Sequence, residues 1–591
     1  MVTSQLKGTA LVVFGKDFPA GRILRRKFNT IVADEKFKKD IEALGSTFVD
    51  LSALIDPGSV FEASAFLEKL SHLSIPGGSR LPKSFMYEGY ELWWIHYNSL
   101  FNYFSFPYTQ HKRLLEYLRE YKSVSIFNSP YTNLLKSYLE AYGCAVDAIA
   151  GPVSMKVLPF GVLVQVIFTA FSLPILILER RKAILFTGDK FEKDKDYDFR
   201  LKFIYKELRE KNIKFVEFIR SLEPWKTVIE HAIKRRRPVI YSEAVTFAGR
   251  FLGFISGGRR RARDKFGIHV IAFEEDPEVR FQFAVATQYL LGVYDDIWAI
   301  RIMKWILPAI GIRAALFIVA SERNAHTVLG AKLNGIPTVG VLHGVASRYG
   351  TPYDFLPGFD GEKLFSVDQY GLWSEWWKDY YIKNSDAYKP EQLYVSGPMR
   401  PLEILKKDET VFNPQKGLTR VLFIAEQSAA PREVMPYLRK LLVWPEIKLT
   451  IKFRPYRDGF EEWLKENEPG VLRLPHIKVV NGAVHEAIAD ADVVVGCRGT
   501  AVLEALLQLK TPIFIKTNKW GDYYNMTATP ETNNFFAQDP DELIEKIKAV
   551  RSLPSEYVAS LREQYFGDPY KNGSQWAVDR VRELIVLSQV P

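Results

Sequence analysis

The sequence predicts an α/β protein built from two doubly wound domains with parallel sheets. Short strands rich in β-branched residues alternate with helical segments in residues 183–241 and again in residues 420–515. In both halves a strand runs into a polar turn that contains glycine, which is where open parallel sheets bind their ligands. With 591 residues, the chain is also too long for a single hydrophobic core.

The expected domains follow one another along the chain. They are residues 1–400, a polar linker at 401–417, a second domain at 418–554, and closing helices at 555–591 that pack back across both domains. The composition, with 47% hydrophobic and 25% charged residues, is that of a folded globular protein. Two cysteines are too few for a disulfide framework or a zinc site, and the N-terminus lacks the pattern of a signal peptide. We therefore expect a cytoplasmic protein.

An aromatic stretch, EGYELWWIHYNSLFNYF, covers residues 88–104. Aromatic density of this kind is typical of core or domain-interface packing. The functional alternative is a stacking platform for sugar rings, in which Glu88, Glu91 or His96 supplies the polar contacts.

Residues 157–178 carry no charge and are numerous enough to span a bilayer. Pro159, Gly161 and Pro174 argue against one uninterrupted helix. A true span would also put residues 1–156 across the membrane from the rest of the chain. We favour a monotopic or re-entrant segment on the cytoplasmic leaflet, with a buried core helix and a real span as alternatives.

The formal net charge of +10 is unevenly distributed, with compact basic runs at residues 234–237 and 259–265. A solvated face is the simplest interpretation of each run. An anionic membrane surface or a phosphate-bearing substrate is the next, and no motif accompanies the runs that would indicate nucleic acid. Asp194, Asp196 and Asp198 lie in a charged loop and are expected to be solvated rather than to bind a metal.

Residues 319–344 hold two polar clusters, each at the carboxyl end of an expected strand. The first is the segment 321–324, which includes Glu322, and the second is His343 followed by Gly344. A lone histidine is more often structural than catalytic, but the strand end and the adjacent glycine favour a function here. Glu322, on the neighbouring strand, is placed to orient His343 or to contact an acceptor.

Residues 491–515, ADVVVGCRGTAVLEALLQLKTPIFI, predict a strand, a glycine turn, a helix that Thr500 can cap, and a second strand. Such a helix start directs backbone N–H groups and a positive dipole end at a bound anion. Arg498 adds a fixed cation, and Glu504, about one turn further on, can accept hydrogen bonds from ribose hydroxyls. An ordinary βαβ unit without a ligand is the alternative.

The chain resembles the GT-B glycosyltransferases, and within them the bacterial and archaeal surface-carbohydrate enzymes, including capsule and lipopolysaccharide Kdo transferases and CDP-glycerol glycerophosphotransferases. The segments IPTVGVLHG (336–344), YVSGPMR (394–400), KFRP (452–455) and GCRGTAVLEALLQLKTPIF (496–514) carry the resemblance, which covers residues 310–550. It implies two Rossmann-like domains with a C-terminal helix crossing back.

The resemblance implies that Arg498, Gly499 and Thr500 hold the phosphate of a nucleotide-sugar donor and that Glu504 holds its ribose. His343 would face them. Where these relatives often have His-Pro, this chain has Arg454 followed by proline. A guanidinium can neutralise a leaving phosphate but does not donate a proton near neutral pH, which argues against a CMP-sugar donor.

The expected reaction is a metal-independent, inverting transfer of a sugar or a glycerol-phosphate-like group to a surface polysaccharide or lipid-linked glycan. His343 is the candidate base, with Glu322 or Glu91 behind it. The nucleotide-sugar enters as a substrate, and no cofactor is expected. The alternatives are a nucleotide-sugar 2-epimerase and a non-catalytic scaffold that binds glycans.

Overall fold

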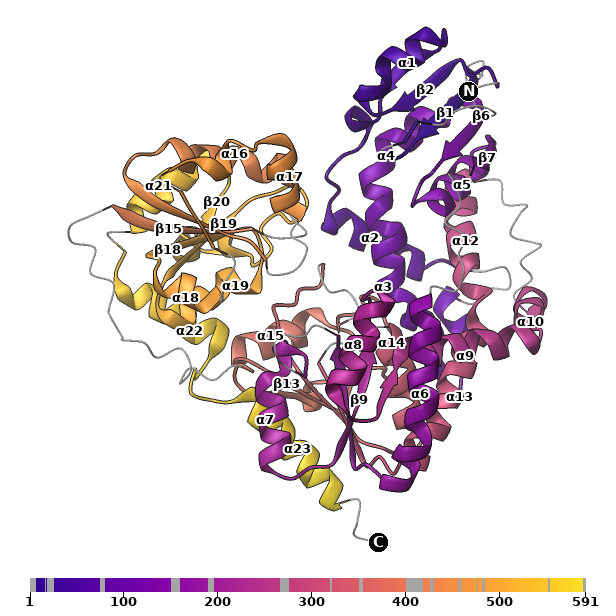
Figure 1. Cartoon of the computed structure of the whole chain (residues 1–591), viewed down its shortest axis with the longest axis vertical. Helices are drawn as coiled ribbons and strands as arrows, with labels where there is room; N and C mark the ends of the chain where they lie inside the picture. Colours follow the sequence, from indigo (N-terminus) through magenta and orange to yellow (C-terminus); the bar gives the residue numbers. More distant parts are fainter. Residues whose placement is uncertain are drawn as a thin grey trace.

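The computed structural model describes residues 7–15, 17–18, 26–74, 80–149, 160–189, 196–265, 276–318, 322–349, 354–399, 418–425, 430–454, 459–475, 477–480, 484–550 and 553–587. Within these residues the chain forms three parallel sheets and one small antiparallel pair (Figure 1).

The N-terminal sheet has five strands in the order β3-β2-β1-β6-β7. Its strands are β1 (Lys7–Val13), β2 (Thr30–Ala33), β3 (Thr47–Asp50), β6 (Tyr121–Phe127) and β7 (Ala145–Ile149). The helices of this part are α1 (Lys38–Ala43), α2 (Val60–Ser71), α3 (Tyr97–Leu100), α4 (Phe106–Leu118) and α5 (Thr132–Ala141). The short pair β4 (Met86–Tyr87) and β5 (Tyr90–Glu91) leads into the 3-10 helix η4 (Leu92–His96).

The middle sheet has seven strands in the order β10-β9-β8-β11-β12-β13-β14. Its strands are β8 (Ala183–Gly188), β9 (Phe215–Arg220), β10 (Val239–Tyr241), β11 (Ala314–Phe317), β12 (Thr338–Val341), β13 (Gln369–Leu372) and β14 (Leu393–Val395). Its helices are α6 (Phe160–Glu179), α7 (Lys202–Glu210), α8 (Trp225–Arg235), α9 (Ser242–Ile255), α10 (Gly258–Lys265), α12 (Pro277–Leu290), α13 (Val293–Ala309), α14 (Glu322–Lys332) and α15 (Glu375–Asn384).

The C-terminal sheet has six strands in the order β17-β16-β15-β18-β19-β20. Its strands are β15 (Thr419–Ile424), β16 (Ile447–Lys452), β17 (Ile477–Val480), β18 (Val493–Gly496), β19 (Thr511–Ile515) and β20 (Phe536–Ala537). Its helices are α16 (Pro431–Val443), α17 (Gly459–Asn467), α18 (Val484–Ala489), α19 (Thr500–Leu503), α20 (Pro530–Asn533) and α21 (Pro540–Val550).

Each of the two larger sheets reverses its strand order at one point. In the middle sheet this point lies between β8 and β11, and in the C-terminal sheet it lies between β15 and β18. Parallel sheets bind ligands outside the carboxyl ends of the two strands that flank such a reversal. The carboxyl edges of the middle and C-terminal sheets around these two reversals are therefore the places where the fold favours binding.

The two last helices, α22 (Ser555–Phe566) and α23 (Gly573–Leu587), return from the C-terminal sheet to the middle one. Trp377 Nε1 donates to the carbonyl of Tyr565 at 2.9 Å, and Ser574 Oγ donates to the carbonyl of Met399 at 2.8 Å. The yellow trace in Figure 1 follows this path from one half of the molecule to the other. Because these bonds are buried, they anchor α22 and α23 to the middle domain.

The predicted α/β fold, with two Rossmann-like halves and a C-terminal helix that crosses back, is confirmed. The first 400 residues, however, contain two sheets where the sequence analysis expected one domain. Alternation of strands and helices does not reveal which strands pair, so the sequence could not separate them. The predicted linker at 401–417 lies outside the described residues.

Helix α6 runs along the edge of the middle sheet beside β10. The hydroxyls of Thr169 and Ser172 accept the backbone N–H groups of Tyr241 and Val239 at 3.0 and 3.1 Å. The helix continues through Pro174, contrary to the expected interruption. We attribute this to the packing of its inner face, which offsets the roughly 3 kcal/mol that an internal proline costs.

The aromatic stretch at residues 88–104 is mostly interior. Trp93, Trp94, Tyr97, Phe101 and Phe104 are all buried. Core packing is therefore the role that these rings have in the fold.

Asp354 lies in the interior beside Tyr381, whose hydroxyl donates to it at 3.5 Å. Burial raises the pKa of Asp354 to about 7, and the hydrogen bond from Tyr381 opposes the rise. Since the folded chain holds this proton more tightly than the unfolded chain, the stabilisation is complete below about pH 4 and is lost as pH rises through about 7.

We predict that Asp354→Asn, which mimics the neutral carboxyl, raises the Tm at pH 8 and changes it little at pH 4.5. Thermal unfolding of the wild type, this variant and the exposed control Asp379→Asn at both pH values measures the effect. An equal shift at the two pH values would contradict the assigned protonation.

Candidate functional site

His343 follows β12 at its carboxyl end, as the sequence predicts. The backbone on either side is fixed, because Trp373 Nε1 donates to the carbonyl of Leu342 at 2.7 Å and the Leu342 N–H donates to the carbonyl of Gly371 at 2.9 Å. The side chain of His343 is half-buried. It therefore stands on a rigid strand end rather than on a free loop.

The glycine turn after β18 differs in detail from its prediction. The residue that precedes the helix is Gly499, and Thr500 is the first residue of α19 rather than its cap. After Leu503 the chain continues as the 3-10 helix η11 (Glu504–Gln508). The expected capping bond is absent because Thr500 does not occupy the cap position, and its hydroxyl accepts from another donor.

That donor comes from the other half of the molecule. The backbone N–H of Val345 donates to Thr500 Oγ1 at 3.1 Å. A Cβ at Gly344 would lie 3.1 Å from the same oxygen, so only glycine allows this approach without displacement. His343 and Arg498 each lie two residues from this bond. The structure therefore brings the two predicted clusters together at one junction.

Arg498 is held by aromatic side chains from the loop that follows β19. Its guanidinium lies 3.9 Å from the ring centroid of Trp520, and its Nη1 lies 3.4 Å from the hydroxyl of Tyr523. The hydroxyl of Tyr524 donates to the Arg498 carbonyl at 2.5 Å. Cation–π contacts of this kind orient a guanidinium without neutralising its charge. The sequence analysis missed these rings, although the run WGDYY at 520–524 was a visible signal.

The N-terminal part also reaches the junction. The N–H of Val60, the first residue of α2, donates to the carbonyl of Lys519 at 3.0 Å. Gly521 has a φ of 53°, and a Cβ there would lie 2.7 Å from Phe61 Cε2. The ring of Phe61 packs against Tyr349 with centroids 4.7 Å apart. All three parts of the chain thus meet around residues 343–349 and 498–521.

Arg454 and Glu504 both lie near the carboxyl edge of the C-terminal sheet. Arg454 is exposed just beyond β16, and β15 separates β16 from β18. Its backbone therefore lies on the same carboxyl edge of the sheet as Arg498. Glu504 is half-buried at the start of η11, about one turn after Thr500.

Glu91 does not join this group among the described contacts. It is buried, accepts a hydrogen bond from Trp94 Nε1 at 2.7 Å, and lies close to Gly361. Burial raises the pKa of Glu91, and the bond from Trp94 opposes the rise. Glu91 is therefore an interior carboxyl that binds Trp94. Glu322 begins α14, after the carboxyl end of β11, and its side chain lies outside the described part.

The expectation of solvation is wrong for Asp198, whereas Asp196 is partly exposed and Asp194 lies outside the described residues. Asp196 pairs with Arg237 at 2.6 Å, and the fully buried Asp198 pairs with Arg200 at 2.5 Å. Within the described residues, no three His, Cys, Asp or Glu side chains are arranged to hold a metal ion. Metal independence remains a prediction.

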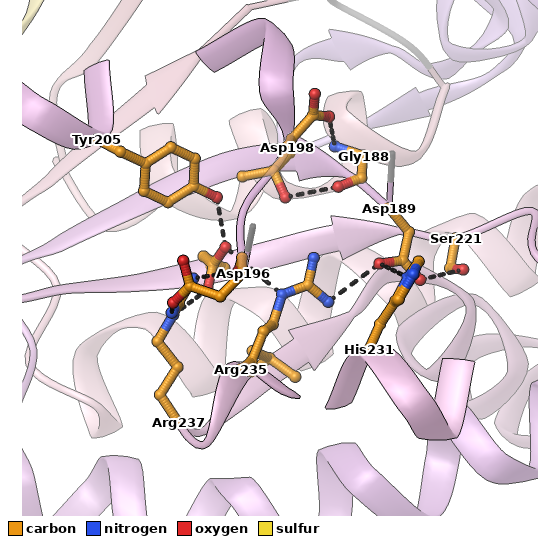
Figure 2. A network of polar contacts seen from close by, with 12 residues as sticks. Gly188, Asp189, Asp196, Asp198, Tyr205, Ser221, His231, Arg235 and Arg237 are labelled. Atoms are coloured by element: carbon orange, nitrogen blue, oxygen red, sulfur yellow. Dashed lines mark hydrogen bonds and ion pairs between the residues drawn. The ribbon is translucent and has the colours of Figure 1, made fainter. Parts of the chain in front are cut away.

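A second group that the sequence analysis missed surrounds Asp189, just after β8 (Figure 2). Asp189 accepts from Ser221 Oγ at 2.7 Å and lies 3.0 Å from His231 Nδ1 and 3.1 Å from Arg235 Nη1. Burial would raise the pKa of Asp189, but His231 and Arg235 hold it below its usual value. Because the aspartate lies between the serine and the histidine, the group cannot activate the serine as a nucleophile. We interpret it as structural.

The same network accounts for part of the basic run at 234–237. Arg235 is buried, and Arg237 Nε pairs with Glu217 at 2.6 Å. These two arginines are internal counter-charges, which leaves Lys234 and Arg236 on the surface.

Asp296 ties the N-terminal part to the middle domain. Its two oxygens lie 2.6 Å from His96 Nε2 and 2.9 Å from His326 Nε2. Burial acts to raise the pKa of Asp296, but the two histidines outweigh it and lower the pKa well below its usual value. His96, a candidate sugar contact in the sequence, is thus a structural partner of this carboxylate.

No protein-family model matches the chain, and no curated protein matches it in sequence. Solved structures similar to it include S. aureus MnaA with UDP, at a TM-score of 0.41 and 11% identity over 70% of this chain and 99% of the other. A Rickettsia africae glycosyltransferase gives 0.37 and 8% over 69% and 99%, and the Neisseria meningitidis UDP-GlcNAc 2-epimerase bound to UDP-GlcNAc gives 0.39 and 11% over 69% and 100%. TM-scores this low describe a loose likeness, so the assignment of two Rossmann-like halves rests on the sheets of the chain itself.

We predict that Thr500→Val, which removes the acceptor of the Val345 N–H, speeds amide exchange at Val345 about tenfold, equivalent to about 1.4 kcal/mol. Thr500→Ser retains the hydroxyl and serves as the matched control. Hydrogen exchange followed at single-residue level measures both, and an unchanged rate in Thr500→Val would contradict the assigned contact.

Proposed function

We propose that the chain is a glycosyltransferase that moves a sugar, or a glycerol-phosphate-like group, from a nucleotide-activated donor to a surface polysaccharide or lipid-linked glycan. The main support for this proposal is the hydrogen bond between Val345 and Thr500, which joins the carboxyl edges of two Rossmann-like halves. Parallel sheets bind ligands at these edges. A donor bound at this junction would contact both halves. The reaction takes place on the cytoplasmic side of the membrane.

The donor side of the proposed site is basic. Arg498 is oriented by Trp520 and Tyr523, and Arg454 projects from the same edge of the C-terminal sheet. Two guanidinium groups there stabilise the negative charge that develops on a departing phosphate. Glu504 accepts the ribose hydroxyls. Since α19 has only four residues, the arginines rather than the helix dipole supply most of this stabilisation.

The acceptor side is the strand end that carries His343. In an inverting transfer the acceptor oxygen bonds to the anomeric carbon while the bond from that carbon to the phosphate oxygen breaks. The imidazole of His343 takes the proton of the acceptor hydroxyl, and the nucleotide leaves with the electron pair of the broken bond.

We predict that His343→Ala lowers kcat by about 10²–10⁴-fold, as expected for loss of a general base. Arg498→Ala lowers it by about 10²–10³-fold through loss of charge stabilisation. The exposed Arg473→Ala, on the same half, is the matched control and keeps wild-type activity. The assay follows free nucleotide released from a panel of nucleotide-sugars, with and without a membrane fraction that contains lipid-linked glycans.

Each outcome decides between functions. Nucleotide release that needs the acceptor supports transfer. A new sugar epimer formed without acceptor indicates a nucleotide-sugar 2-epimerase instead. Equal glycan output from the wild type, His343→Ala and Arg498→Ala indicates a non-catalytic scaffold and overturns the proposal.

A further inference from the structure

Helix α6 is apolar on its exposed face and polar on its buried face, which is the reverse of an ordinary surface helix. Its 20 residues have a mean hydropathy of 2.3 over an 18-residue window, and only 28% of that window is buried. The large apolar side chains on its outer face include Phe160, Leu163, Ile167, Phe171, Ile175 and Leu178. Phe171 is 74% exposed and Leu178 is 85% exposed. These positions recur at intervals of three and four residues, so they form one continuous stripe.

The polar residues of α6 face the opposite way. Gln165, Thr169 and Ser172 are the only polar side chains between residues 160 and 178, and all three are buried. Thr169 and Ser172 accept the N–H groups of the edge strand β10. A helix exposed to water on its outer face has the reverse pattern. The outer face of α6 is therefore built for an apolar surrounding.

The apolar surface continues onto α9, which packs against α6. Near the end of α9, Phe251, Phe254 and Ile255 are exposed, and Phe254 is 75% exposed. On the other side of α6, Phe160 packs edge-on against Trp225 of α8 with centroids 5.0 Å apart. Figure 1 shows α6 between α8 and α9, with α10 projecting beyond α9. Apolar patches of this extent on a soluble protein mark an interaction site.

Cations border this surface. Helix α10 follows α9 directly and carries four arginines and one lysine against one aspartate, all exposed. On α8, the exposed Lys226, Lys234 and Arg236 lie on the opposite side of α6, together with the single acid Glu230. An apolar stripe bordered by basic residues matches the boundary of an anionic bilayer, where acyl chains adjoin phosphate headgroups.

Residues that precede α6 in the sequence contact residues that follow it, so α6 does not separate two sides of a membrane. His96 lies before α6 in the chain and contacts Asp296, which lies after it. Gln288 Nε2 likewise donates to Ser137 Oγ at 3.1 Å. Withdrawing α6 into a bilayer would also leave the N–H groups of Val239 and Tyr241 without acceptors.

We propose that α6, together with the exposed end of α9, docks the protein in the plane of an anionic lipid bilayer, with α10 on the phosphate headgroups. The apolar side chains enter the headgroup–acyl boundary by about 5–10 Å. The buried hydroxyls of α6 remain on β10, so the helix lies on the membrane and does not cross it. This inference is independent of the reaction proposed above.

The first test measures binding of the full chain to vesicles of phosphatidylcholine, with and without phosphatidylglycerol, by co-sedimentation. We expect binding that phosphatidylglycerol strengthens and salt weakens. The double variant Phe171→Glu and Leu178→Glu lowers the bound fraction at least tenfold. Val443→Glu, at a 78% exposed position on α16, is the matched control and binds like the wild type. Circular dichroism confirms that both fold, since all three positions are exposed.

The second test separates the cationic part from the apolar part. Arg259→Gln with Arg260→Gln abolishes the preference for phosphatidylglycerol. Lys38→Gln with Lys39→Gln removes the same charge from α1, which is distant from α10 in the sequence. This variant keeps the preference for phosphatidylglycerol. A fluorophore on Phe171→Cys shifts to the blue on vesicles, and one on Val443→Cys does not. The native cysteines are both buried.

Three outcomes would overturn the proposal. In the first, the wild type stays in the supernatant with both kinds of vesicle. In the second, the Phe171→Glu and Leu178→Glu variant binds vesicles as well as the wild type. The third outcome is that the wild type is a dimer without vesicles, that the double variant is a monomer, and that vesicles bind neither protein. The exposed face of α6 would then be an interface between protein copies.

Discussion

The hydrogen bond from the backbone of Val345 to the hydroxyl of Thr500 is the contact on which the proposed site depends. It forms because Gly344 presents no side chain to Thr500, and because the strand end before it is fixed by Trp373. The bond places the histidine of one half and the arginine of the other within two residues of a shared point. Without it the two binding edges would be separate features of separate sheets.

Several polar groups of the middle domain are directed inward. Asp189, Asp198 and Asp296 are buried with cationic or histidine partners, and the hydroxyls of α6 serve the edge of the sheet. Buried carboxylates are costly unless paired, so these networks hold the domain in one arrangement. With its polar residues used internally, α6 is left with an apolar outer face. The orientation of α6 therefore explains both the hydrogen bonds of its hydroxyls to β10 and the apolar stripe on its exposed face.

Much of the fold and part of the site could be predicted from the sequence. Strand and helix alternation predicted parallel sheets, and the polar strand ends indicated His343 and Arg498, each of which lies two residues from the bond between Val345 and Thr500. The separation of residues 1–400 into two sheets could not be predicted, because periodicity does not specify strand pairing. The bond of Thr500 to Val345, the burial of Glu91 and the pairing of Asp196 with Arg237 all depend on contacts between residues distant in sequence. Local patterns favoured a helix cap, a carboxylate behind the candidate base and a solvated loop instead.

The most direct measurement of the central claim is amide hydrogen exchange of the full chain with a series of nucleoside diphosphates. A nucleotide bound at the junction should slow exchange in both segments, residues 342–349 of the middle domain and residues 496–504 of the C-terminal domain. Protection confined to one half, or to the N-terminal sheet, would contradict a shared site, as would the absence of protection with every nucleotide.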